Sequence, residues 1–112
     1  MKYMLLVYDD PKQWTDITEE QMKGLYVEYG AVAQNPATTG SAQLQPVETA
    51  KTVRIKDGAT LVTDGPFAET KEQLGGYYIV EADSIDDAAK IGAQIPSARM
   101  GGSVEVRPLV EM

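Results

Sequence analysis

The sequence contains no cysteine and no histidine, and these two absences restrict its chemistry more than any residue that is present. Without cysteine there is no disulfide framework, no thiolate nucleophile and no structural zinc site of the usual kind. Without histidine the chain lacks the commonest general base and the commonest metal ligand. We therefore expect no cofactor and no transition metal. Any catalysis must use carboxylates, lysine, tyrosine, arginine, hydroxyls or backbone groups.

Long apolar runs and positive charge are also scarce. The longest fully apolar run, residues 4–7, is far too short for a membrane-spanning helix. The formal net charge of −7 disfavours both a phosphate backbone and an anionic membrane surface as partners. The first residues follow a strand pattern and lack the regions of a signal peptide. We expect a cytoplasmic protein with no direct nucleic-acid partner and no membrane partner.

The chain has the size and composition of one globular domain. It has 112 residues, of which 43% are hydrophobic and 24% are charged. Thr18 and Gln21 match a capping box at the start of a helix, which Pro36 ends. Ser84 is the expected N-cap of a second helix, which Pro96 ends. Residues 68–74 are polar and compatible with one or two further helical turns.

The remaining apolar segments predict strands. Residues 3–8, 42–45, 77–81 and 103–107 have strand composition, and 52–56 and 59–63 alternate around Asp57-Gly58, a favoured hairpin turn. The order of elements predicts an α+β fold: a ferredoxin-like antiparallel sheet with two helices on one face. The first strand and residues 77–80 are apolar on both faces, and no segment remains to cover the second face. We therefore expect a homodimer through the helix-free sheet face.

One string within this pattern is distinctive. Residues 61–76 read LVTDGPFAETKEQLGG, and further matching pieces are MKYMLL at 1–6, LQP at 44–46 and VEVRP at 104–108. The chain thereby resembles the DGPF-domain branch of the YciI-like, or YCII-related, family over nearly its whole length, as one domain at 1–112.

The resemblance implies a ferredoxin-like domain in a dimeric α/β barrel, which agrees with the two-faced strands. It supplies no settled activity, because these proteins are largely uncharacterised. Genes of this branch often accompany extracytoplasmic-function sigma factors, which implies a regulatory setting. YciI-like relatives elsewhere are thought to use a histidine–aspartate pair, and this chain cannot form one. The resemblance therefore brings over the fold and the place of the cleft, and no catalytic mechanism.

Asp64, at the end of the predicted hairpin, is the best single candidate for a catalytic carboxylate, although the catalytic residue remains unknown. One interpretation is a base or polar anchor beside a cleft. The other is ordinary Asp-Gly-Pro turn chemistry, in which the side chain accepts a backbone N–H. The motif needs its glycine and proline as much as its acid, which favours the turn interpretation over the functional one.

Other side chains are candidates for lining a ligand site. Phe67 either borders a pocket or anchors its loop in the core, and Trp14 either anchors a surface loop or covers the mouth of a cleft. Arg99, in a glycine-flanked loop, suits the carboxylate or phosphate of a ligand. The strand tyrosines Tyr8 and Tyr78 serve either as pocket walls or as core packing.

A cleft bordered by a carboxylate, a guanidinium and phenols suits a small polar aromatic molecule or an acid. The expected ligand-binding set is Asp64, Phe67, Arg99, Tyr8 and Tyr78. The preferred function is a homodimeric small-molecule-binding or regulatory protein without a cofactor. The alternative is a cofactor-independent enzyme, such as an isomerase, cyclase or monooxygenase, acting on a small organic substrate. A third hypothesis is a module that binds a transcription factor. The fold permits all three.

Overall fold

The computed structural model describes residues 1–66 and 70–111, in which two helices pack against antiparallel strands. The main sheet consists of β1 (Lys2–Asp9), β2 (Thr38–Gln43), β5 (Gln73–Glu81) and β6 (Ser103–Pro108), in the order β2-β5-β1-β6. All of its neighbouring strands are antiparallel. A separate hairpin consists of β3 (Lys51–Lys56) and β4 (Ala59–Asp64). With the helices α1 (Glu19–Ala33) and α2 (Ile85–Gly92), this confirms the α+β class.

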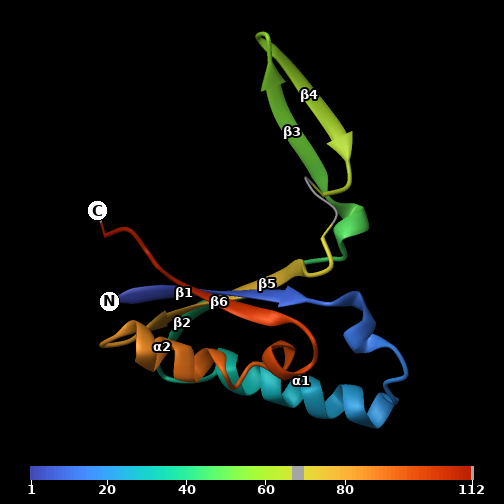
Figure 1. Ribbon diagram of the computed structural model, residues 1–112. Coiled ribbons are helices and arrows are strands. Elements are labelled where there is room, and N and C mark those ends of the chain that lie inside the picture. Colours follow the sequence, from blue (N-terminus) through green and yellow to red (C-terminus); the bar gives the residue numbers. More distant parts are fainter. Residues whose placement is uncertain (67–69, 112) are drawn as a thin grey trace.

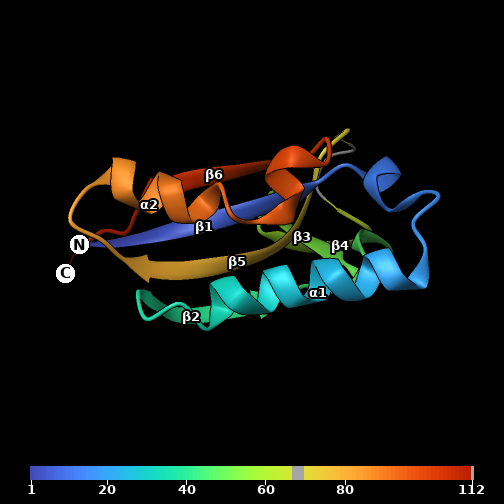
Figure 2. The same ribbon diagram turned by 90° about the horizontal axis from the view of Figure 1, so that it is seen from below.

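Both helices lie on the same face of the four-stranded sheet (Figure 1). Seen from the helix side, α2 lies over β1 and β6, and α1 lies along β2 (Figure 2). The core fills the space between these layers. It consists of alternate residues of β1 and β5 together with side chains of the two helices and the turn after α2: Tyr3, Leu5, Val7, Val32, Tyr78, Val80, Ala88 and Ile95.

Both predicted helix starts are confirmed. The Thr18 hydroxyl accepts a hydrogen bond from the backbone N–H of Gln21, and the Gln21 side chain accepts one from the Thr18 N–H. The Ser84 hydroxyl accepts one from the backbone N–H of Asp87. These caps satisfy backbone donors that have no partner within the helix. Of the helices described, none is long and apolar enough to cross a membrane.

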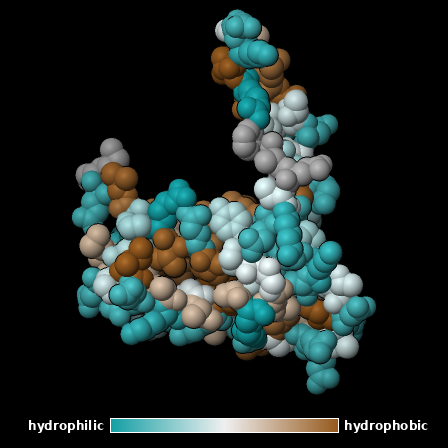
Figure 3. Space-filling view, viewed as in Figure 1, coloured by the Kyte–Doolittle hydropathy of each residue, from teal (hydrophilic) through white to brown (hydrophobic). Residues whose placement is uncertain are grey.

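The predicted hairpin is also confirmed, and it projects away from the body on the side of the sheet opposite to the helices (Figure 1). Asp57 and Gly58 both have positive φ, as a two-residue turn of this type requires. Apolar side chains near the tip are open to solvent (Figure 3), with Val53 62% and Ile55 68% exposed. We call this hairpin, 51–64, the arm.

The segment after the arm differs from the sequence prediction. The helical turns expected at 68–74 are wrong for residues 70–74, because Thr70 to Glu72 form no helix and Gln73 and Leu74 belong to β5. Residues 67–69 lie outside the described part of the chain. Gly75 and Gly76 lie inside β5 and do not precede it. The weaker strand expected at 42–45 starts earlier and ends at Gln43. The prediction failed here because residues 73–76, although part of a strand, do not alternate between apolar and polar side chains.

Candidate functional site

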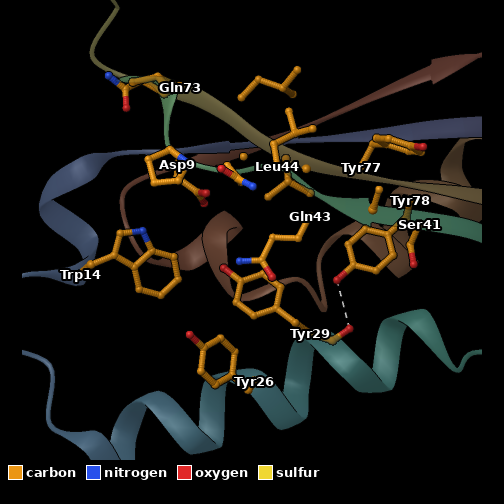
Figure 4. A pocket seen from close by; sticks show the side chains of 18 of the residues that line it. Asp9, Trp14, Tyr26, Tyr29, Ser41, Gln43, Leu44, Gln73, Tyr77 and Tyr78 are labelled. Atoms are coloured by element: carbon orange, nitrogen blue, oxygen red, sulfur yellow. Dashed lines mark hydrogen bonds between the residues drawn. The ribbon is translucent and has the colours of Figure 1, made fainter. Parts of the chain in front are cut away.

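A pocket of about 690 Å³ lies between α1 and the ends of β1, β2 and β5. Met22, Tyr26, Tyr29, Gly30 and Ala33 of α1 line one side, and residues 41–48 and 73–78 line the other. Trp14 and Asp9 lie at one end, Tyr78 lies at the other, and Gln43 stands between (Figure 4). We call this cavity the α1 pocket. Its volume is typical of sites for small organic molecules.

A chain of hydrogen bonds ends on Asp9. The Oδ1 atom of Asp9 accepts from the Ser97 hydroxyl at 2.6 Å and from the Gln13 amide nitrogen at 3.0 Å. The Ser97 oxygen is 2.6 Å from the Tyr29 hydroxyl. Ser97, the middle member of this link between β1, α1 and the turn after α2, is fully buried, while Asp9 and Tyr29 are half-buried. A carboxylate held by two donors on one oxygen has a fixed orientation.

Two glycine-rich places allow this arrangement. A Cβ atom on Gly75 would overlap Oδ2 of Asp9, so only glycine lets the carboxylate lie across β5. Gly75 is also the extra residue of a bulge, since Val7 pairs with Gly76 and Tyr8 pairs with Leu74. Bulges often redirect side chains beside functional sites. The second place is Gly102, directly before β6, where a Cβ atom would overlap the carbonyl oxygen of Tyr8.

The phenols of the site are held in their neutral form. Burial raises the pKa of Tyr29 above its ordinary value, although the hydrogen bond with Ser97 partly opposes this. Burial likewise raises the pKa of Tyr78, whose hydroxyl donates to the main-chain oxygen of Tyr29 at 3.0 Å. Neither phenol can therefore act as a base near neutral pH. Both serve as hydrogen-bonding groups.

Aromatic rings form one end of the pocket. The ring centroids of Trp14 and Tyr29 are 6.4 Å apart, and Tyr26 of α1 also lines the cavity. Trp14 ends a short 3₁₀ helix, Pro11–Trp14, which Asp10 caps. The Gln13 side chain completes that cap through the Asp10 N–H and also reaches Asp9. The cap thus places Trp14 and Asp9 together, and of the two interpretations of Trp14, its place favours the cleft mouth.

The structure separates the residues that the sequence predicted for a common site. Tyr78 lines the α1 pocket. Tyr8 lines a different, shallower hollow of about 520 Å³, together with Lys71, Glu72 and Ser103. Of the predicted ligand-binding residues that the structure describes, only Tyr78 lies in the pocket that holds Asp9. For the other members of the set, ligand binding stays a prediction.

Asp64 and Arg99 are both engaged in exposed ion pairs. The Asp64 carboxylate lies 2.7 Å from Nζ of Lys51, across the base of the arm, and the Arg99 guanidinium lies 2.6 Å from Glu28 of α1. Neither residue lines either hollow of the described residues. Phe67 lies outside the described residues. The catalytic role suggested for Asp64 is therefore untested.

Sequence reasoning missed the Asp9–Ser97–Tyr29 chain. Asp9, Ser97 and Tyr29 are not among the site residues that the sequence predicts. The signal available was an acidic residue that directly follows a buried strand, together with two adjacent glycines at 75 and 76. Ser97 is 88 residues from Asp9, and no local pattern connects them. Among residues 1–66 and 70–111, no group of three or more acidic side chains is placed to hold a metal ion.

Two comparisons with known proteins, one with a family model and one with single proteins, agree with each other. The model of the YCII-related domain matches residues 1–112, which is the whole chain. An uncharacterised protein of Rhizobium meliloti (strain 1021) is 37% identical over 114 residues, covering 97% of this chain and 92% of that protein. The similarity thus extends over both chains almost completely.

Proposed function

The chain belongs to the YCII-related domain family, and from this premise we propose that it is a homodimeric protein that binds a small organic molecule in the α1 pocket. The observation that carries the proposal is the carboxylate of Asp9, fixed by Ser97 and Gln13 beside a cavity of about 690 Å³. Fixed polar groups in a mostly apolar cavity are the usual design of a small-molecule site.

Binding is favoured over catalysis by the state of the polar groups. The Ser97 hydroxyl is fully buried and already donates to Asp9, so it is not placed to attack a ligand. The raised pKa values of Tyr29 and Tyr78 remove them as bases near neutral pH. A nucleophile needs a base within hydrogen-bond reach and access to the substrate. Among the described residues of the pocket no such pair is present.

The finer classification is part of the same proposal. The strand order β2-β5-β1-β6 with two helices on one face supports a ferredoxin-like sheet. The string at 61–76 supports membership of the DGPF branch, and the regulatory link to sigma factors rests on that resemblance. The free sheet face supports the proposal of a homodimer of dimeric α/β barrel type. The cross-strand pairs Leu6–Tyr77 and Met4–Ile79 lie on the face opposite to the buried core and remain half-buried.

A fragment screen observed by ¹⁵N–¹H NMR tests binding in the pocket. The library consists of neutral, anionic and cationic fragments at millimolar concentration. We expect a group of fragments to shift the amide signals of α1 around Gly30 and of residues 41–48. If no fragment in the library shifts this set of signals, the proposal is contradicted.

Two glycines of α1 provide a matched pair of variants. Gly30 lines the pocket and Gly24 does not, and a Cβ atom at either position meets open space. Leucine has a higher helix propensity than glycine, so neither variant should lose stability. We expect Gly30→Leu to abolish fragment binding by filling the pocket, while Gly24→Leu leaves it intact. Unchanged binding to Gly30→Leu would place the ligand elsewhere.

A further inference from the structure

The directions of the hydrogen bonds around Asp9 determine which atoms remain for a ligand. Ser97 donates its single hydroxyl hydrogen to Oδ1 of Asp9. Since that hydrogen is committed, the hydroxyl of Tyr29, 2.6 Å away, must donate to Ser97. The chain of donors therefore runs one way, from Tyr29 through Ser97 to the carboxylate.

The second oxygen of Asp9 is also an acceptor. Both hydrogen bonds that the described residues give to the Asp9 side chain end on Oδ1. Its Oδ2 lies against Gly75, which itself lines the α1 pocket. An ionised carboxylate accepts and cannot donate. At this end of the pocket the Asp9 carboxylate thus offers an acceptor oxygen to an incoming molecule.

The rest of the lining agrees in charge and in aromatic character. The titratable acids that line the pocket are Asp9 and Glu48, and the lining among the described residues includes no lysine and no arginine. Trp14, Tyr26 and Tyr29 supply aromatic rings at the same end. The faces of such rings attract cations. An anionic ligand would meet a carboxylate there and no positive side chain.

We propose that the α1 pocket takes a small organic cation, an amine protonated at neutral pH, whose ammonium group lies against Oδ2 of Asp9 among the aromatic rings, with its apolar part along α1. This inference rests on the proposed function, since it names the ligand class of the same pocket. The sequence suggested a small polar aromatic molecule or an acid; an acid is disfavoured here because Arg99 pairs with Glu28 and does not line this cavity.

Three probes of matched size and different head group test the class: 2-phenylethylammonium, 2-phenylethanol and 3-phenylpropionate. Trp14 is the only tryptophan of the chain, so its fluorescence reports occupancy of the pocket. We expect the ammonium compound to bind about tenfold more tightly than the alcohol, because hydrogen bonds to charged groups are the strong ones. The carboxylate should bind most weakly.

The variant Asp9→Asn removes the charge and keeps the shape of the side chain. We expect it to lose most of the preference for the ammonium compound over the alcohol. Asp57→Asn is the matched control: it makes the same change in net charge at the turn of the arm, where asparagine also tolerates positive φ. Since Asp9→Asn could impair folding, the comparison of the three head groups on the unmodified protein stands by itself.

The possible outcomes separate this inference from the proposed function. If the alcohol or the carboxylate binds as tightly as the ammonium compound, the ligand class is wrong and the pocket remains a binding site. The same conclusion follows if none of the three binds while other fragments bind in a manner that Gly30→Leu abolishes. If no fragment binds in the pocket at all, both proposals fail.

Discussion

Asp9 is held by residues from three separate parts of the chain. Gln13 follows it closely, Gly75 underlies it from β5, and Ser97 reaches it from the turn after α2. Such a site is a product of tertiary structure, so the sequence pointed to Asp64, whose Asp-Gly-Pro motif is visible locally. For Tyr78 the sequence left pocket wall and core packing open, and the residue belongs to the core and also lines the pocket, with its hydroxyl bonded to the Tyr29 main chain.

Gly75→Ala is expected to disturb the site directly. The added methyl group overlaps the Asp9 carboxylate, so the variant should lose about 1–3 kcal/mol of unfolding free energy. Chemical denaturation measures this loss. In the double variant Asp9→Ala with Gly75→Ala the overlap is absent, and the combined loss should be smaller than the sum of the single losses. Strict additivity would show that the two residues do not interact.

Tyr29 is expected to make stability depend on alkaline pH. Its pKa is raised in the folded protein, so the folded state retains the proton after the unfolded state has lost it. Its contribution is complete below the unfolded value of about 10 and is lost as the pH rises through the folded value. Denaturation between pH 8 and 11 should show this fall, and Tyr29→Phe should reduce it. Tyr26→Phe, at a position 59% exposed, is the control that should leave the profile unchanged.

At the scale of elements, short-range sequence motifs determine where the helices begin and where the hairpin turns. The caps at Thr18 and Ser84 and the turn at Asp57-Gly58 are short-range motifs, and each lies where the sequence placed it. The expected helix over 68–74 was wrong for 70–74, because β5 begins at Gln73 in a polar stretch with two glycines. There the pairing with β1 and β2 outweighs local propensity.

Removal of one helix cap tests how far α1 depends on its local signal. Thr18→Ala deletes the acceptor for the Gln21 N–H and should cost about 1 kcal/mol, which lowers the melting temperature by roughly 4–8 °C. Calorimetry measures the change. Thr18→Ser keeps the hydroxyl and should remain within a degree or two of the original. A similar loss in both variants would mean that the methyl group of Thr18, and not the cap, is responsible.

At the scale of the whole molecule, the helix-free face and the arm form one open side. The arm projects from that side, and its apolar residues near the tip are exposed (Figure 1, Figure 3). Exposed apolar side chains that gather on one side of a small domain often mark an interface. A second copy related by two-fold symmetry would cover both surfaces in each protomer at once. Each copy carries a charge of −7, so mutual repulsion opposes the assembly.

Sedimentation velocity at micromolar concentration should therefore show a dimer, and Leu6→Lys should convert it to a monomer. Leu6 lies on the helix-free face, where a buried ammonium group without a partner is strongly unfavourable. Val27→Lys is the control, because Val27 of α1 is 72% exposed and faces away from the proposed interface. Added salt should tighten the dimer, since screening weakens the repulsion between two acidic copies. A monomer in the unmodified protein, or a dimer that Leu6→Lys leaves intact and Val27→Lys breaks, would contradict an interface on this face.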